Sequence, residues 1–311
     1  MTDRLTRCLA RRAADKAPAL RLVIAETTEL CAHACGLHHL SPLASIAFSR
    51  ALTAGTLLAA LAKSERNINV QIAGDGPLGS VFVDADPKGT VRGYVSRNPA
   101  LQPAPGIRPR VGYAFGDSGY VNVLRADASN NYFRGTVALK TGEIDDDITE
   151  YLVASEQVES VLAIDAVLDD RGRVVRAGGV LLQALPGDGE PLSLQDERDR
   201  LRAGVLYESL MQQGESWPGA ITAAFQLERS VLEQSPLGWQ CQCSDNRVMA
   251  ALLATGIDEL NDILAKEAKA EIRCDFCTKE YLFDRDQLLK LRDLAVSAAL
   301  SHRDKDDHGD N

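Results

Sequence analysis

Four cysteines near the carboxyl end of the chain carry the clearest chemistry in the sequence. Cys241 and Cys243 form a C-x-C pair, and Cys274 and Cys277 form a C-x-x-C pair, with 30 residues between the two pairs. Such pairs can close four thiolates tetrahedrally around one soft divalent metal, most plausibly zinc. We therefore predict one Zn²⁺ per chain, bound by these four sulfurs. The alternatives are four unpaired core thiols or two structural disulfides.

A zinc site of this kind makes the local fold sensitive to oxidation. Zinc holds the thiolates ionised and supplies folding free energy to a small module. Oxidation of the sulfurs would release the metal and remove that free energy. A fold that depends on reduced sulfur can therefore report oxidation, so the four ligands are also candidate redox-active residues.

Cysteine usage and the amino terminus bear on the cellular compartment. Residues Met1 to Lys16 are charged and lack the apolar core of a secretion signal, and the chain has seven cysteines, an odd number. No apolar run is expected to reach the length of a membrane span, so we expect no membrane as a partner. These features predict a reducing, cytoplasmic location, which disfavours disulfides as the resting state.

Length and charge narrow the functional classes. The 311 residues, 45% of them hydrophobic, suffice for one sizeable core and a smaller module. The net charge of −10 argues against a zinc-ribbon adaptor that binds nucleic acid. A redox enzyme with Cys274 and Cys277 as a catalytic dithiol would need a surrounding βαβ pattern, which the sequence lacks. No histidine lies between His39 and His302, which removes the usual base for nucleophilic catalysis, so we expect no enzyme.

Residues 1–185 are predicted to form an α+β domain in which an antiparallel sheet packs with helices. A helix at 41–63 begins with a capping Ser and a Pro in its first turn, and a second helix at 144–157 has acidic residues at its amino end. Alternating apolar residues and turn signals predict antiparallel strands within three segments, 68–96, 120–139 and 160–185.

Three further segments follow this domain. After the breaker cluster Pro186–Pro191, residues 186–236 are predicted to be a helical linker, with helical pieces at 192–213 and 221–234 that lean on a neighbour. Residues 237–296 are predicted to form a zinc-binding redox-switch domain, hereafter the zinc module. It contains a helix-turn-helix between the cysteine pairs, then a strand and a helix. Residues 297–311 are polar and predict an unordered tail.

The remaining cysteines are less informative. Cys31 and Cys35, with histidines nearby, resemble a second metal site. However, cysteines four residues apart in an alanine-rich run are more often packed side chains, because free cysteine behaves as a small apolar residue. Cys8 has no assigned role.

Several motifs occur in an order that is specific as a set. They are the four cysteines of the zinc module, Tyr281 and Phe283, Ser155–Gln157, Gly74–Gly79, Ala177–Gly179, and Leu182–Pro186. Over nearly the whole chain, this set resembles one family, the redox-regulated holdase chaperones known as heat-shock protein 33. One departure follows the first cysteine pair. The family usually has Ser, a charged residue, Glu and Arg there, whereas this chain reads Ser244-Asp245-Asn246-Arg247.

The resemblance implies an ATP-independent chaperone that is inactive when reduced and zinc-loaded. On oxidation, such a protein would join Cys241 to Cys243 and Cys274 to Cys277 as disulfides, lose zinc, and unfold the zinc module and the linker. It would then bind unfolded or partly folded client proteins, as a homodimer when active. We expect the client surface on the released linker and on the sheet beneath it.

Overall fold

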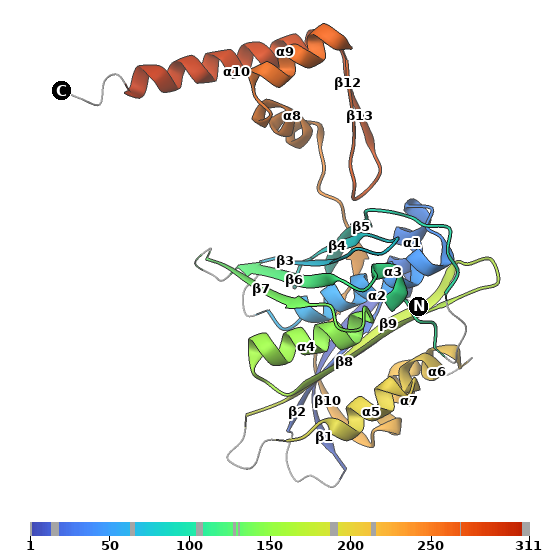
Figure 1. Cartoon of the computed structure of the whole chain (residues 1–311). Helices are drawn as coiled ribbons and strands as arrows, with labels where there is room; N and C mark the ends of the chain where they lie inside the picture. Colours follow the sequence, from blue (N-terminus) through green and yellow to red (C-terminus); the bar gives the residue numbers. More distant parts are fainter. Residues whose placement is uncertain are drawn as a thin grey trace. The chain divides into compact units, whose positions relative to one another are not determined.

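Figure 1 shows the computed structural model of the chain, which describes residues 2–13, 19–62, 66–103, 108–126, 129, 131–186, 192–212, 216–267 and 269–306. The chain divides into two compact units, Met1–Gln240 and Cys241–Asn311. Two features expected from the sequence lie partly outside the described residues. These are the breaker cluster, at 187–191, and the predicted tail, at 307–311.

Helix α2 (Pro42–Ala59) forms the centre of the first unit. It begins as predicted, because the Ser41 hydroxyl accepts a hydrogen bond from the Ala44 amide and Pro42 occupies the first turn. The helix is long and apolar enough to cross a membrane, so the expectation that no run approaches that length is wrong. Its 18-residue apolar window is nevertheless 94% buried inside the unit. Burial within the protein explains the apolar composition of this helix.

A six-stranded sheet covers one side of α2. Its strand order is β11-β5-β4-β3-β6-β7, with parallel pairing only between β11 and β5. The predicted antiparallel strands at 68–96 and 120–139 are confirmed. The strands of this sheet are β3 (Ile68–Gly74), β4 (Ser80–Ala85), β5 (Thr90–Val95), β6 (Gly119–Ala126), β7 (Tyr132–Ala138) and β11 (Gly238–Trp239).

A five-stranded antiparallel sheet covers the other side of α2, in the order β10-β1-β2-β9-β8. The predicted hairpin at 160–185 is confirmed as β8 and β9, whereas β1 and β2 were not expected from the sequence. The strands of this sheet are β1 (Arg4–Arg12), β2 (Leu20–Glu26), β8 (Ser160–Leu168), β9 (Val174–Ala184) and β10 (Leu227–Pro236).

The main core of the first unit lies around α2, which contacts strands of both sheets. Helices α1 (Thr28–Leu37), α3 (Gly112–Phe115) and α4 (Ile144–Glu156) complete this layer. Arg50 of α2 is fully buried, and its guanidinium donates to Glu143 at 3.0 Å and to Asp165 at 2.7 Å. These ion pairs compensate the cost of burying the guanidinium charge.

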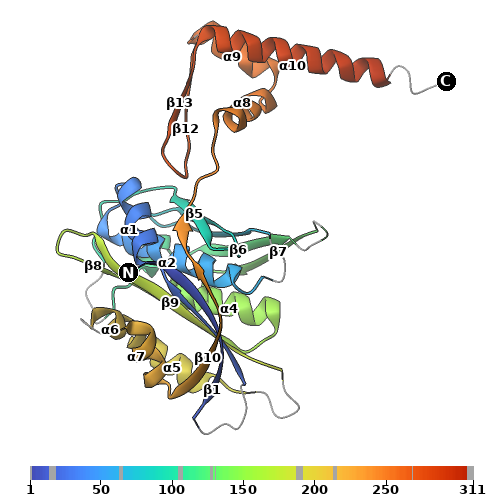
Figure 2. The same ribbon diagram turned by 180° about the vertical axis from the view of Figure 1, so that it is seen from behind.

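The described part of the predicted linker contains three helices and one strand. The helices are α5 (Gln195–Arg202), α6 (Val205–Met211) and α7 (Trp217–Ala224), and they lie along the five-stranded sheet (Figure 2). The predicted helix at 221–234 is wrong beyond Ala224, because Gln226 turns the chain with a φ of 52° and β10 then pairs with β1. Ladder hydrogen bonds to an open sheet edge override a weak helical preference.

The helices α5, α6 and α7 cover a second apolar cluster. Their buried side chains include Leu201, Leu206 and Leu210, and they pack with buried residues of β2, β8 and β9. By contrast, the side chains of residues 228–234 in β10 are all exposed. The three helices are therefore held by apolar packing, whereas β10 is held mainly by its backbone ladder.

The second unit is small. Its helices are α8 (Asp245–Ala254), α9 (Ile257–Lys266) and α10 (Arg285–Asp306), and its strands are β12 (Ala270–Arg273) and β13 (Glu280–Phe283). The predicted helix-turn-helix, and the strand and helix after it, are confirmed. The prediction of an unordered tail is wrong for residues 297–306, because α10 continues to Asp306. Each added residue contributes one more backbone hydrogen bond to the helix. In its described part, the buried core has seven residues, Leu252, Leu260, Ala270, Tyr281, Phe283, Leu288 and Leu291.

Candidate metal centre

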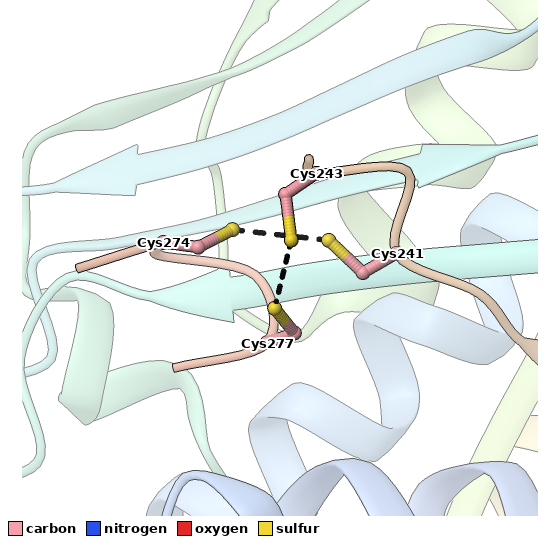
Figure 3. A group of neighbouring side chains, drawn as sticks. All are labelled: Cys241, Cys243, Cys274 and Cys277. Atoms are coloured by element: carbon pink, nitrogen blue, oxygen red, sulfur yellow. Dashed lines mark hydrogen bonds between the residues drawn. The ribbon is translucent and has the colours of Figure 1, made fainter. Parts of the chain in front are cut away.

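The four cysteines of the second unit lie together. Their sulfur atoms are all within 4.8 Å of one another (Figure 3), and all four thiols are free. The Sγ atoms of Cys241 and Cys274 are 3.8 Å apart, and those of Cys243 and Cys277 are 3.2 Å apart. Four thiolates at zinc–sulfur distances of about 2.3 Å in a tetrahedron would have sulfurs about 3.8 Å apart. The arrangement can therefore close around a single metal ion.

Local interactions hold the first pair in place. Cys241 and Cys243 precede α8, whose first turn is capped by the Ser244 hydroxyl accepting from the Arg247 amide. The Arg247 guanidinium donates to the backbone and side-chain oxygens of Gln242, at 3.0 and 3.2 Å. Ser244 and Arg247 thus organise the turn, and Asn246 does not replace a sulfur ligand.

A tight turn between β12 and β13 presents the second pair. The Cys274 amide donates to the Lys279 carbonyl at 2.9 Å, and the Thr278 amide donates to the Cys274 carbonyl at 2.8 Å. Thr278 has a φ of 59°, a left-handed conformation that reverses the chain directly after Cys277. The hairpin therefore brings both thiols of the C-x-x-C pair to one end.

The thiols of Cys241, Cys243 and Cys277 differ in their readiness to ionise. Burial raises the pKa of Cys243, but the Tyr281 hydroxyl and the other three thiols stabilise its thiolate and lower the pKa to about 7. Burial is the main cause that raises the pKa of Cys277 to about 12, and it also raises the pKa of Cys241. One thiolate forms easily, and its negative charge opposes the ionisation of the neighbouring thiols. A bound dication would remove this conflict, because it stabilises several thiolates at once.

Tyr281 is the neighbour of the site that sequence reasoning did not identify as a site residue. It lies on β13, is 3% exposed, and packs in the same apolar cluster as Cys243. Its hydroxyl is buried and meets no hydrogen-bond partner of normal geometry in the described part of the chain. The alternation of β13 is the available sequence signal, because it turns Tyr281 and Phe283 inward while Leu282 is 68% exposed.

The other three cysteines are packed side chains, as predicted for Cys31 and Cys35. Both are buried in the first unit, where the Cys31 thiol donates to the Ser49 carbonyl and the Cys35 thiol to the Ser45 carbonyl. Burial raises the pKa of Cys31 to about 12 and that of Cys35 to about 11, so both stay protonated near neutral pH. Cys8 is buried in the cluster beneath α5, α6 and α7.

Comparison with known proteins gives a consistent result over most of the chain. The family model described as Hsp33 protein matches residues 3–284. A 33 kDa chaperonin of Desulforamulus reducens is 36% identical over 273 residues, covering 87% of this chain and 92% of the relative. A 33 kDa chaperonin of Acaryochloris marina is 39% identical over 299 residues, covering 94% and 97%. The crystal structure of a 33 kDa chaperonin from Thermotoga maritima covers 96% of this chain and all of its own, with a TM-score of 0.77 and 25% identity.

Proposed function

Since the chain belongs to the Hsp33 family of chaperones, we propose that it is an ATP-independent holdase whose activity is switched on by oxidation. The observation that carries the proposal is the cluster of four free thiols in a module with a small core of its own. Its relatives are named chaperonins, which implies a non-enzymatic role. Unfolded or partly folded proteins are the proposed partners.

We assign one Zn²⁺ to Cys241, Cys243, Cys274 and Cys277 in the reduced protein. An all-sulfur, four-ligand set favours zinc over harder cations, which prefer oxygen ligands. Bound zinc would supply the positive charge that keeps all four sulfurs ionised, together with a cross-link between two segments of the chain. Structural zinc contributes on the order of 10 kcal/mol to small modules, as much as the whole stability of many domains. With so few buried apolar residues, the zinc module depends on these bonds.

Oxidation removes the thiolates. Two thiolates lose two electrons to form one disulfide, and these electrons, with two protons, reduce one molecule of hydrogen peroxide to two of water. We propose the pairs Cys241–Cys243 and Cys274–Cys277, although the sulfur contacts of 3.8 and 3.2 Å in the reduced protein join one pair to the other. Contacts between one cysteine pair and the other separate once the module unfolds, because their partners are 33 or 34 positions apart in the sequence. The two cysteines of each pair stay close in any conformation, because only one or two residues separate them.

The proposed client surface is the apolar face beneath α5, α6 and α7. In the reduced state these helices bury Leu206 and Leu210 against the five-stranded sheet. The chain runs from α7 through β10 and β11 directly into Cys241, so the first metal ligand follows this segment in sequence. We propose that unfolding of the zinc module spreads to residues 186–236. The exposed face of the sheet and the released segment then bind apolar parts of a client.

We further propose a cytoplasmic location and an active homodimer, with neither nucleic acid nor membrane as a partner. The net charge of −10 supports the exclusion of nucleic acid, since such partners favour a basic surface. The described residues contain one apolar helix of membrane-spanning length, α2, and its burial within its unit argues against a role as a membrane span. Sedimentation of the oxidised and reduced protein tests the dimer, because only the oxidised form should gain mass.

The test is to treat the reduced protein with peroxide while following released zinc, free thiols and the light scattering of a thermally unfolding client enzyme. We expect one zinc per chain to be released as four thiols disappear, and scattering to fall only after this release. Zinc release without any change in client aggregation would overturn the chaperone assignment while leaving the metal site intact.

A matched pair of variants tests the ligands. Cys241→Ser should lose zinc and loosen the module under reducing conditions, because the alcohol is a poor zinc ligand. Cys31→Ser, at a buried thiol outside the module, should keep its zinc. Equal zinc content in the two variants would refute the ligand assignment.

A further inference from the structure

The buried hydroxyl of Tyr281 raises a question that packing alone does not answer. The side chain is 3% exposed, and the Lys279 ammonium lies 4.5 Å from the centre of its ring. In the described part of the chain, its hydroxyl oxygen has no hydrogen-bond partner of normal geometry. Buried polar atoms are almost always satisfied, so an exception calls for a partner that is weak or absent in this state. A phenylalanine would fill the same space without this cost.

The candidate acceptor is the sulfur of Cys243. Cys243 packs against the cluster that contains Tyr281, and the tyrosine hydroxyl interacts with this sulfur without the geometry of a normal hydrogen bond. A neutral thiol is a poor acceptor, whereas a thiolate accepts hydrogen bonds strongly. A hydroxyl without a good partner beside a thiol therefore gains one when that sulfur is held as a thiolate. Metal binding does this, since zinc ligands must be deprotonated.

We infer that Tyr281 is a positioning residue of the metal site, whose hydroxyl donates an O–H···S hydrogen bond to the Cys243 thiolate in the metal-loaded protein. The inference rests on the proposed zinc site. The bond fixes the orientation of one sulfur and withdraws electron density from it. Because it stabilises the thiolate against protonation, it favours metal binding at neutral pH, and because it withdraws electron density, it slows reaction of that sulfur with electrophiles. Since Tyr281 lies on β13, the bond also ties the first cysteine pair to the hairpin that carries the second.

The experiment compares Tyr281→Phe with Phe283→Leu in the reduced, full-length chain. Tyr281→Phe removes one oxygen atom and keeps the ring. Phe283→Leu alters packing at a position that is 4% exposed on the same face of the same strand, without removing a hydrogen-bond donor. Zinc affinity is measured by competition with a chromophoric chelator, and circular dichroism at saturating zinc shows that each variant is folded. The cobalt-loaded proteins give the energy of the thiolate-to-metal charge-transfer band.

We expect Tyr281→Phe to bind zinc 10- to 100-fold more weakly, the usual effect of losing a hydrogen bond to a metal ligand. Its charge-transfer band should shift, because the hydrogen bond acts on the electrons of the sulfur, while Phe283→Leu should keep the wild-type band. Unchanged affinity and band in Tyr281→Phe would overturn the inference, as would equal changes in both variants. A wild-type chain that binds no zinc would overturn the proposed metal site itself, which separates the two failures.

Discussion

Shortening one buried side chain of α6 should activate the protein without oxidation. Leu210 has 0% of its surface exposed and belongs to the apolar cluster between the helices and the five-stranded sheet. Truncation of a fully buried Leu to Ala costs about 3 kcal/mol or more. Because about 1.4 kcal/mol corresponds to a factor of ten, Leu210→Ala should raise the population of chains with these helices released roughly a hundredfold.

The neighbouring residue provides the control. Met211 lies on the same helix but is 53% exposed, so Met211→Ala should leave the docking of the helices almost unchanged. Both variants are assayed reduced and zinc-loaded, by light scattering of an unfolding client enzyme and by binding of a dye that fluoresces on apolar surfaces. Zinc content is measured in the same samples.

The expected result is that Leu210→Ala suppresses client aggregation and binds the dye while it retains its zinc, and that Met211→Ala does neither. If Leu210→Ala exposes apolar surface but leaves client aggregation unchanged, the face beneath α5, α6 and α7 is not the client site. If Met211→Ala activates equally, helix docking is not what keeps the reduced protein inactive.

Three other predictions concern residues of the first unit. The two tryptophans of the chain, Trp217 and Trp239, lie in or next to the predicted linker, so their emission should shift to longer wavelength on activation; unchanged emission in an active sample would contradict linker release. The thiols of Cys31 and Cys35 keep their protons in the folded state up to pKa values of about 12 and about 11, against 9.0 as the ordinary value. The unfolded state therefore loses these protons first, and the free energy of unfolding should fall as pH rises from 9 to 11, less steeply in a double Ala variant. Arg50→Met should lower the free energy of unfolding in urea by about 3 kcal/mol or more, because it leaves buried carboxylates without their cation; a change below about 1 kcal/mol would show that they are otherwise compensated.

The sequence is most informative where spacing alone determines geometry. The C-x-C and C-x-x-C pairs indicate a shared metal site, because two such short pairs can bind one metal ion whatever the fold of the residues between them. Alternation with turn signals locates β3 to β9, since turn residues and a period of two act locally. The Ser41-Pro42 start of α2 is local in the same way.

Features that depend on distant partners escape such reasoning. The sequence of β1 is rich in arginine and does not have the pattern of a partly buried strand. Its Arg4, Arg7 and Arg11 pair with carboxylates on β2 and β10, and these partners cannot be identified from the local sequence. The charged segment after Ala224 looks helical until the open edge of β1 offers a backbone ladder. Tyr281 is visible in the sequence only as part of a motif, since its place beside Cys243 depends on how the hairpin packs.

Removing zinc without oxidation tests directly whether thiolate–zinc bonds keep the second unit folded. The reduced protein is treated with a chelator, and hydrogen–deuterium exchange is compared with that of the zinc-loaded protein. Peptides from 241–306 should lose their protection, while those from β2, β8 and β9 keep theirs. A reduced, metal-free chain that remains fully protected across 241–306 would contradict the proposed switch.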